Sequence, residues 1–77
     1  MHKSITTAGY QRVIERFKKV RLDAELTTRD LGEILGESHS FVVRVETLQR
    51  RLDIYQFVMY CRALGLDPAT TIKILES

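Results

Sequence analysis

Apolar residues recur at helical spacing from Tyr10 onward. Along the first segment they return every three or four positions, the period of a helix with one apolar face, at Tyr10, Val13, Ile14, Phe17, Val20 and Ala24. Thr7 precedes this stripe and can cap the first helical turn with its hydroxyl. The pattern predicts a mobile arm over residues 1–7, followed by one domain over residues 8–77 that opens with a helix.

A second helix is predicted directly afterwards. Thr27 stands at its N-cap, Asp30 occupies the capping-box position, and Gly36 can end the helix in a left-handed conformation. Between these signals the residues predicted to face inward are Leu31, Ile34 and Leu35. The short stripe predicts about two helical turns.

Ser38 restarts a helix two residues later. The residues spaced to reach a core are Phe41, Val42 and Val45. Their β-branched neighbours also suit a strand. We favour a helix because the cap and the spacing agree, and because a single strand would have no partner.

Two more helices complete the pattern. Asp53 caps the first of them, which Gly65 ends, and Asp67 followed by Pro68 opens the last one. In that last helix the residues predicted to face inward are Ile72 and Leu75. The chain is therefore predicted to be all-α, a compact five-helix bundle without a sheet.

The composition removes several classes of protein. The chain has 77 residues, of which 44% are hydrophobic and 29% charged, as in an ordinary globular domain. Its single cysteine, Cys61, excludes an internal disulfide and a cysteine-based zinc site, and is most simply a core residue. No apolar run approaches the roughly 18 residues of a membrane span. We expect a cytoplasmic protein with no metal, no cofactor and no membrane partner.

Charge is distributed unevenly along the chain. Residues 1–22 carry six basic groups against one acidic group, residues 23–37 carry five acidic groups against one basic group, and residues 38–52 are basic again. Two basic segments separated by an acidic one can form a one-sided positive face that suits a polyanion. Solvated helix faces account for the same pattern equally well.

The second and third predicted helices have the form of a helix-turn-helix. Their sequences are TRDLGEILGES and HSFVVRVE. Gly32 is small enough for the second helix to approach the first, and Gly36 supplies the left-handed residue of the turn. The residues predicted to pack beneath the crossing are Leu31, Leu35, Val42 and Val45.

These residues resemble a known family. Residues 26–46, LTTRDLGEILGESHSFVVRVE, followed by RRLDIYQFVMYCRALGLDP, are similar to the phage repressor/Cro-type (XRE-like) helix-turn-helix family. The resemblance covers about residues 10–76. It implies a five-helix bundle of the lambda-repressor-like type in which helices 2 and 3 form the DNA-binding motif.

The resemblance also implies which residues meet double-stranded DNA. Its second motif helix, here about residues 39–47, enters the major groove, and the base-reading positions are His39, Ser40, Val43 and Arg44. Arg44 is the strongest of these because a guanidinium matches two acceptors of guanine. The residues that suit phosphates are Lys18, Lys19, Thr28, Arg29, Arg50 and Arg51. For two residues an interpretation other than base contact stays open. His39 can be a polar surface residue, and Phe41 can be a half-buried aromatic residue.

Two further expectations concern the ends of helices. In the family, an arginine late in the first helix pairs with the glutamate that closes the recognition helix, and Arg21 and Glu46 match both positions. We interpret them as a structural clamp. Family members usually place a glycine soon after that glutamate, whereas this chain has Thr47 and Leu48, so a longer third helix is predicted.

The fourth predicted helix carries more apolar residues than one buried stripe can hold. The candidates for a dimer interface are Tyr55 and Met59, together with Ile72 and Leu75 of the last helix. A symmetric homodimer would place two recognition helices one DNA turn apart on a palindrome. The alternative is that Tyr55 and Met59 fold over the edge of the core.

Three functions are consistent with these features. The first is a sequence-specific transcriptional regulator, expected to repress by binding a palindromic operator. The second is an antitoxin that binds a toxin protein and represses its own promoter. The third is a helical scaffold without DNA binding. The sequence offers no nucleophile with a partner base, phosphate-binding loop or carboxylate pair, so we expect no enzymatic activity.

Overall fold

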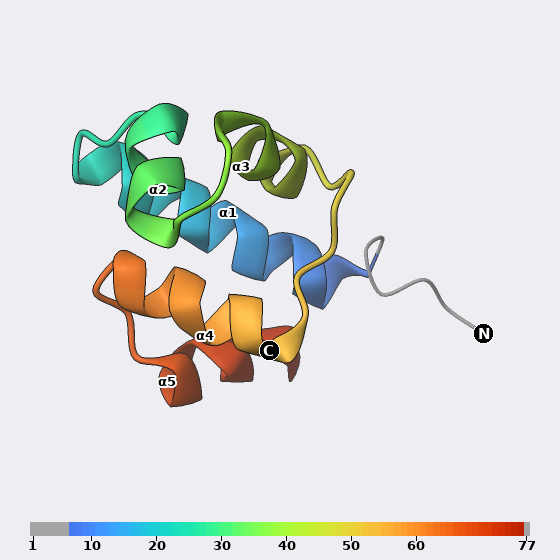
Figure 1. The fold of residues 1–77 in the computed structure, drawn as a ribbon. Coiled ribbons are helices and arrows are strands. Elements are labelled where there is room, and N and C mark those ends of the chain that lie inside the picture. The colour runs from blue at the N-terminus through green and yellow to red at the C-terminus, as the bar shows by residue number, and fades with distance from the viewer. Residues whose placement is uncertain (1–6, 77) are drawn as a thin grey trace.

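The computed structural model describes residues 7–76, and over that range the chain is a bundle of helices (Figure 1). Its elements are α1 (Ala8–Asp23), α2 (Thr28–Leu35), α3 (His39–Glu46), α4 (Ile54–Ala63), α5 (Pro68–Ile72) and the 3-10 helix η2 (Lys73–Glu76). No strand occurs within residues 7–76. The prediction of an all-α fold with five helices is confirmed, with the last helix continuing as a 3-10 turn. The predicted arm falls outside the described residues except for Thr7, which caps α1.

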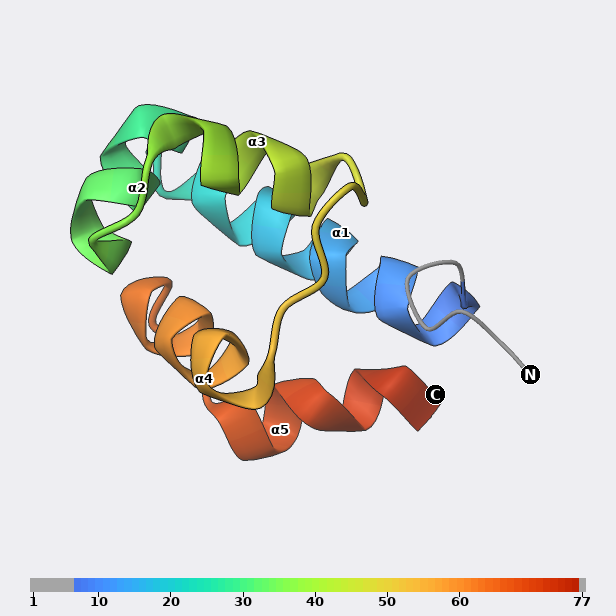
Figure 2. The same cartoon turned by 45° about the vertical axis from the view of Figure 1, so that its right-hand side comes forward.

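α1 is the central element of the bundle. In Figure 1 and Figure 2, α2 and α3 lie on one side of it and α4 and α5 on the other. The C-terminal segment returns to the start of α1, where the backbone of Leu75 lies so close to Gly9 that a Cβ there would overlap the Leu75 carbonyl oxygen. The pair α2–α3 is therefore presented on one side of the molecule.

Helices begin at the polar residues that the sequence predicted. At the start of α2, Thr27 Oγ1 accepts a hydrogen bond from the Asp30 amide at 2.9 Å, and the Asp30 carboxylate accepts one from the Thr27 amide at 2.9 Å. The hydrogen bond that the carboxylate accepts from the Thr27 amide, and then the interaction with the Thr27 side chain, lower the pKa of the Asp30 carboxyl. Asp53 and Gln56 form a second such box at the start of α4. The remaining caps are Thr7, Ser38 and Asp67.

α1 and α3 end at left-handed residues that are not glycine. The φ angle is 60° at Glu25 and 64° at Leu48. After α3, the Gln49 amide donates to the Arg44 carbonyl oxygen at 2.8 Å, the bond that closes a left-handed helix end. The prediction that the third helix runs past Glu46 is therefore wrong. Leu48 adopts the conformation usual for glycine while its side chain packs against the core.

The core lies between α1, α2, α3 and α4. Its buried apolar residues are Val13, Ile14, Phe17, Leu31, Val42, Val45, Tyr60 and Cys61. The Phe17 ring stacks on the ring of Tyr60 with centroids 4.7 Å apart, and it also meets Phe57 at 5.9 Å. Aromatic stacking thus joins α1 to α4.

Three residues predicted to face inward are exposed. Ile34 is 55% exposed, Ile72 42% and Leu75 40%. α2 is so short that its buried face is confined to Leu31 and Gly32. At the end of the chain the helix tightens into a 3-10 turn, which changes the angle between successive side chains. In place of the predicted pair, Thr71 is buried and Ile74 packs against the core.

The left-handed backbone at Glu25 generates a stability prediction. Glu25 is exposed, so a glycine there loses no core packing. The substitution E25G should raise the free energy of unfolding by roughly 0.5–1 kcal/mol, because the penalty for a left-handed non-glycine residue exceeds the added flexibility of the unfolded chain. Urea denaturation measures the change. The control E25A removes the charge but keeps the Cβ, and an equal gain there would show that charge, not backbone strain, is responsible.

Candidate nucleic-acid interface

The turn between α2 and α3 is built on two glycines. Gly36 has a φ of 72°, and in this conformation the Glu37 amide donates to the Gly32 carbonyl oxygen at 2.8 Å. A Cβ at Gly32 would lie 2.9 Å from the carbonyl oxygen of Glu37 and 3.1 Å from that of Ser38. From the sequence, this space was expected to admit the approaching second helix. In the structure the backbone of the turn occupies it.

α3 buries one face and exposes the other. Val42 and Val45 are fully buried, which fixes the helix on the bundle. The predicted base-reading residues lie on the other face, where His39, Ser40 and Arg44 are exposed and Val43 is 36% exposed. The segment is a helix capped by Ser38. Within the described residues 7–76, the four predicted base-reading side chains therefore lie on one solvent-facing surface of α3.

A hydrogen bond joins the starts of α2 and α3. Thr28 Oγ1 and His39 Nδ1 lie 2.9 Å apart, and the tautomer of the imidazole decides which of them donates. With Nδ1 engaged, the Nε2 atom of His39 is the ring nitrogen left for a ligand. The predicted phosphate contact at Thr28 and the predicted base contact at His39 are thus physically coupled.

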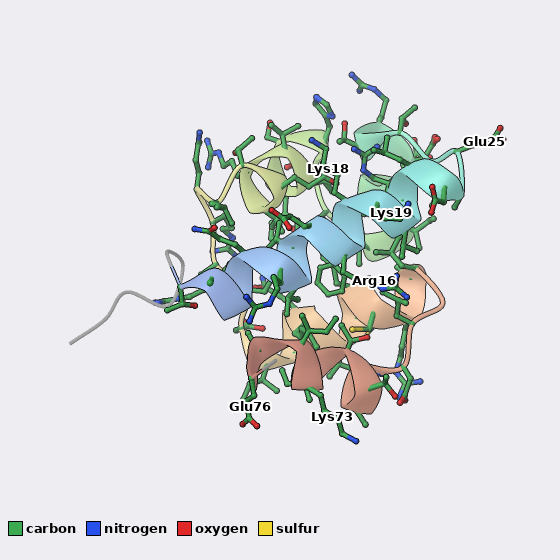
Figure 3. All side chains as sticks on the ribbon, turned by 180° about the vertical axis from the view of Figure 1, so that it is seen from behind. Arg16, Lys18, Lys19, Glu25, Lys73 and Glu76 are labelled. Atoms are coloured by element: carbon green, nitrogen blue, oxygen red, sulfur yellow. The ribbon has the colours of Figure 1, made fainter. Side chains whose placement is uncertain are left out.

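Two of the predicted phosphate contacts lie beside α3. The exposed Arg50 guanidinium stands 5.2 Å from the centroid of the Phe41 ring, a cation–π contact that holds it against the helix. Lys18 on α1 borders a hollow that is also lined by Glu46 and Leu48, at the end of α3. Figure 3 shows Lys18 on the edge of α1 nearest α3.

The other basic candidates lie further apart. Arg29 is exposed in the first turn of α2. Lys19, which Figure 3 shows on α1, forms an exposed ion pair with Asp23 at 3.5 Å. Arg51 borders a hollow at the start of α4. The predicted phosphate contacts are therefore spread over α1, the first turn of α2 and the segment after α3.

A buried ion pair ties α3 to α1. Arg21 Nε donates to Glu46 Oε2 at 2.6 Å and Arg21 Nη2 donates to Glu46 Oε1 at 2.9 Å. The two side chains are only 8% and 6% exposed. Arg21 Nη1 also donates to the carbonyl oxygen of Leu26 at 2.8 Å, just before α2. The pairing with Glu46 raises the pKa of Arg21. One guanidinium therefore fixes both helices of the motif to α1.

The hydroxyl of Tyr60 lies in the electrostatic field of this pair. Burial, and then the charge of Glu46, raise the pKa of Tyr60, so the phenol stays neutral. Within residues 7–76 its oxygen has no hydrogen-bond partner. The buried Tyr60 ring thus contributes to the core by stacking on Phe17.

Several features of this surface were not predicted. The Thr28–His39 bond and the Arg50–Phe41 contact join residues whose roles were predicted separately. Away from this surface, at the start of α4, the apolar residue Ile54 is 85% exposed and was also missed. Its position directly after the Asp53 cap was the available signal, since the first residue of a helix has few neighbours to bury it.

Among the residues that the structure describes, other kinds of site are not found. No three histidine, cysteine, aspartate or glutamate side chains gather in a way that could hold a metal ion. None of the described helices combines the length and the apolar character needed to cross a bilayer.

The arrangement of helices and the exposed face of α3 define a helix-turn-helix protein, the fold class of DNA-binding regulators. A solved structure with this fold, an XRE-family like protein from Pseudomonas syringae pv. tomato str. DC3000, is 36% identical in sequence with a TM-score of 0.81. The similarity covers 90% of this chain and 84% of the other. No protein-family model and no curated protein matches the sequence. The chain belongs to the XRE-like helix-turn-helix family, which confirms the resemblance.

The buried ion pair generates a second stability prediction. The substitution E46Q removes the charge that compensates Arg21 and should lower the free energy of unfolding by about 3 kcal/mol. Chemical denaturation followed by circular dichroism measures this loss. The double variant R21M/E46L removes both charges and should recover part of it, because no buried charge is left unpaired. A double variant less stable than E46Q would show that the pair is net stabilising in its own right.

Proposed function

We propose that the protein is a sequence-specific DNA-binding transcriptional regulator that places α3 in the major groove. The observation that carries the proposal is the outer face of α3, where four side chains able to contact bases project from a helix clamped to the bundle. A helix is the element that fits the major groove of B-DNA. Family membership supports the same function.

Arg44 is the proposed main base contact. It is exposed on the outer face of α3, and its guanidinium can donate two parallel hydrogen bonds to O6 and N7 of guanine. Ser40 and His39 lie earlier on the helix, where family members read bases, and Val43 can contact a thymine methyl group. Together they are the proposed determinants of sequence preference.

Phosphate contacts are proposed to supply most of the affinity. Thr28 and Arg29 lie in the first turn of α2, where free backbone amides favour an anion. Arg50 and Lys18 flank α3. Lys19 is available as well, since its exposed ion pair with Asp23 is weak and a phosphate can compete with it.

The finer proposal is a repressor that binds a palindromic operator as a homodimer. A single domain of this size contacts one half-site, and two-fold symmetry of the protein is matched by two-fold symmetry of the DNA. Exposed apolar residues at Tyr55, Met59, Ile72 and Leu75 support association of two copies. Occupation of such a site blocks a promoter without a further domain.

A random-library selection with purified protein tests the function and yields the site. On the selected duplex, R44A should lose roughly 1–3 kcal/mol of binding free energy and relax the preference at one position in each half-site. R29A should instead weaken binding equally on all sequences and reduce the salt slope by about 0.9. The exposed Arg62 of α4 offers the control R62A, which should leave binding unchanged. If the selection enriches no sequence, the proposal is overturned. If R44A loses binding affinity equally on all sequences, the role proposed for Arg44 is overturned.

The Thr28–His39 hydrogen bond should influence base preference. T28V keeps the shape of the side chain but removes the bond, which frees the imidazole to rotate and should change the preference beside His39. T28S retains the hydroxyl and should preserve the preference. Selections with T28V, H39A and the double variant form a cycle. If T28V changes the base preference as strongly in the H39A background as in the wild-type background, Thr28 does not act through His39.

A further inference from the structure

Arg50 is a cation that no acidic side chain neutralises. Its side chain is exposed, and within residues 7–76 it forms neither an ion pair nor a hydrogen bond. Lys19 is different, because the carboxylate of Asp23 pairs with it. What holds the Arg50 guanidinium is the ring of Phe41, whose centroid lies 5.2 Å from the central guanidinium carbon. Arg50 therefore keeps its full charge while its position is restricted.

An aromatic ring holds a cation in a way that suits a phosphate ligand. A carboxylate would attract the guanidinium strongly, but it would neutralise the charge and occupy the N–H donors that a phosphate needs. The negative face of an aromatic ring attracts a cation through its quadrupole and brings no net charge. Arginine suits such a contact because its guanidinium is flat and weakly hydrated. The contact with Phe41 thus leaves Arg50 able to bind a phosphate.

The backbone after α3 directs Arg50 toward Phe41. At Leu48 the φ angle is 64°, and Figure 2 shows the chain reversing direction after α3 before it continues to α4. The amides of Gln49 and Arg50 then both donate to the Arg44 carbonyl oxygen, at 2.8 Å and 3.2 Å. Arg50 lies beyond the end of α3, yet its guanidinium lies beside Phe41 in the first turn of that helix. The side chain therefore runs back along α3.

The ring that holds Arg50 lies at the edge of the outer face of α3. Residues three apart are neighbours on a helix surface, so Phe41 is adjacent to Arg44, the proposed main base contact. Phe41 is half-buried, whereas Arg44 is exposed. The sugar–phosphate backbones of DNA border the major groove, and proteins position themselves on a duplex by contacts to these phosphates. A cation held at the edge of α3 is therefore close to a phosphate once the helix has entered the groove.

We propose that Phe41 is a positioning residue that holds the Arg50 guanidinium beside α3 for a backbone phosphate of DNA. The inference rests on the proposed function, because it requires that α3 enters the major groove. Phe41 contributes to affinity, since a long side chain that is already ordered in the free protein loses less conformational entropy on binding. This is a third role for Phe41, besides the half-buried aromatic residue and the base contact that the sequence left open.

Fluorescence anisotropy titrations of the full chain against a labelled duplex of mixed sequence test the positioning. R50A should weaken binding and reduce the salt slope by about 0.9, the value for one phosphate contact. F41L keeps an apolar side chain but removes the ring. It should weaken binding roughly two- to tenfold, because the Arg50 side chain must then be ordered on binding. F41W keeps an aromatic face and should retain the wild-type affinity.

A double-mutant cycle separates positioning from a purely structural role. In the R50A background, F41L should have no further effect on DNA binding, because the side chain that Phe41 positions is absent. F57L is the matched control, since Phe57 is another half-buried aromatic residue and its ring contacts that of Phe17. F57L should leave binding unchanged where circular dichroism shows the variants to be folded. An equal loss in F57L, or an F41L effect as large with R50A as without it, would overturn the proposal.

Base preference distinguishes positioning from direct base contact. In a random-library selection F41L should enrich the same sequence as the wild type, and a preference changed at one position would show that Phe41 contacts a base and overturn the inference. If F41L and R50A are coupled in a protein that selects no sequence, only the proposed sequence-specific function is overturned. If the protein selects a sequence but the two substitutions are not coupled, only this inference is overturned. A protein that binds no DNA would overturn both.

Discussion

The buried pair of Arg21 and Glu46 is the interaction on which the geometry of this small domain depends. Arg21 lies near the end of α1, Glu46 is the last residue of α3, and the same guanidinium also holds the chain at Leu26 before α2. The end of α1, the chain just before α2 and the end of α3 are thereby fixed by one side chain. Because a bidentate pair is rigid in direction as well as distance, it sets the angle at which α3 stands on the bundle.

Helix starts could be predicted because their chemistry is local. Thr7, Thr27, Ser38, Asp53 and Asp67 each bond an amide three residues further on, and nothing distant is needed to recognise them. Helix ends and exposed faces were less predictable. Leu48 adopts a strained backbone only because its side chain gains core contacts from elsewhere in the chain. The exposure of Ile34, Ile72 and Leu75 likewise depends on how much surface neighbouring helices cover.

The candidate site likewise combines features that the local sequence predicts with features that depend on contacts between distant residues. Helical period alone places Val42 and Val45 inward, which leaves His39, Ser40 and Arg44 outward. The contact between Thr28 and His39 depends instead on the crossing of two helices, and that between Arg50 and Phe41 on the turn after α3. Neither has a signature in the sequence. The exposure of Ile54 did have a local signal, its position directly after the Asp53 cap, and this signal was missed.

The length of α3 limits how many base pairs this helix can contact if it enters the major groove as proposed. Eight residues rise about 12 Å at ~1.5 Å per residue, which matches the stacking distance of about four base pairs. A given sequence of four base pairs occurs by chance roughly every 256 positions. That is far too often to mark one site among the ~10⁶ or more competing sites of a genome. A binding site that is unique on a chromosome therefore has to be contacted by more than one helix of this length.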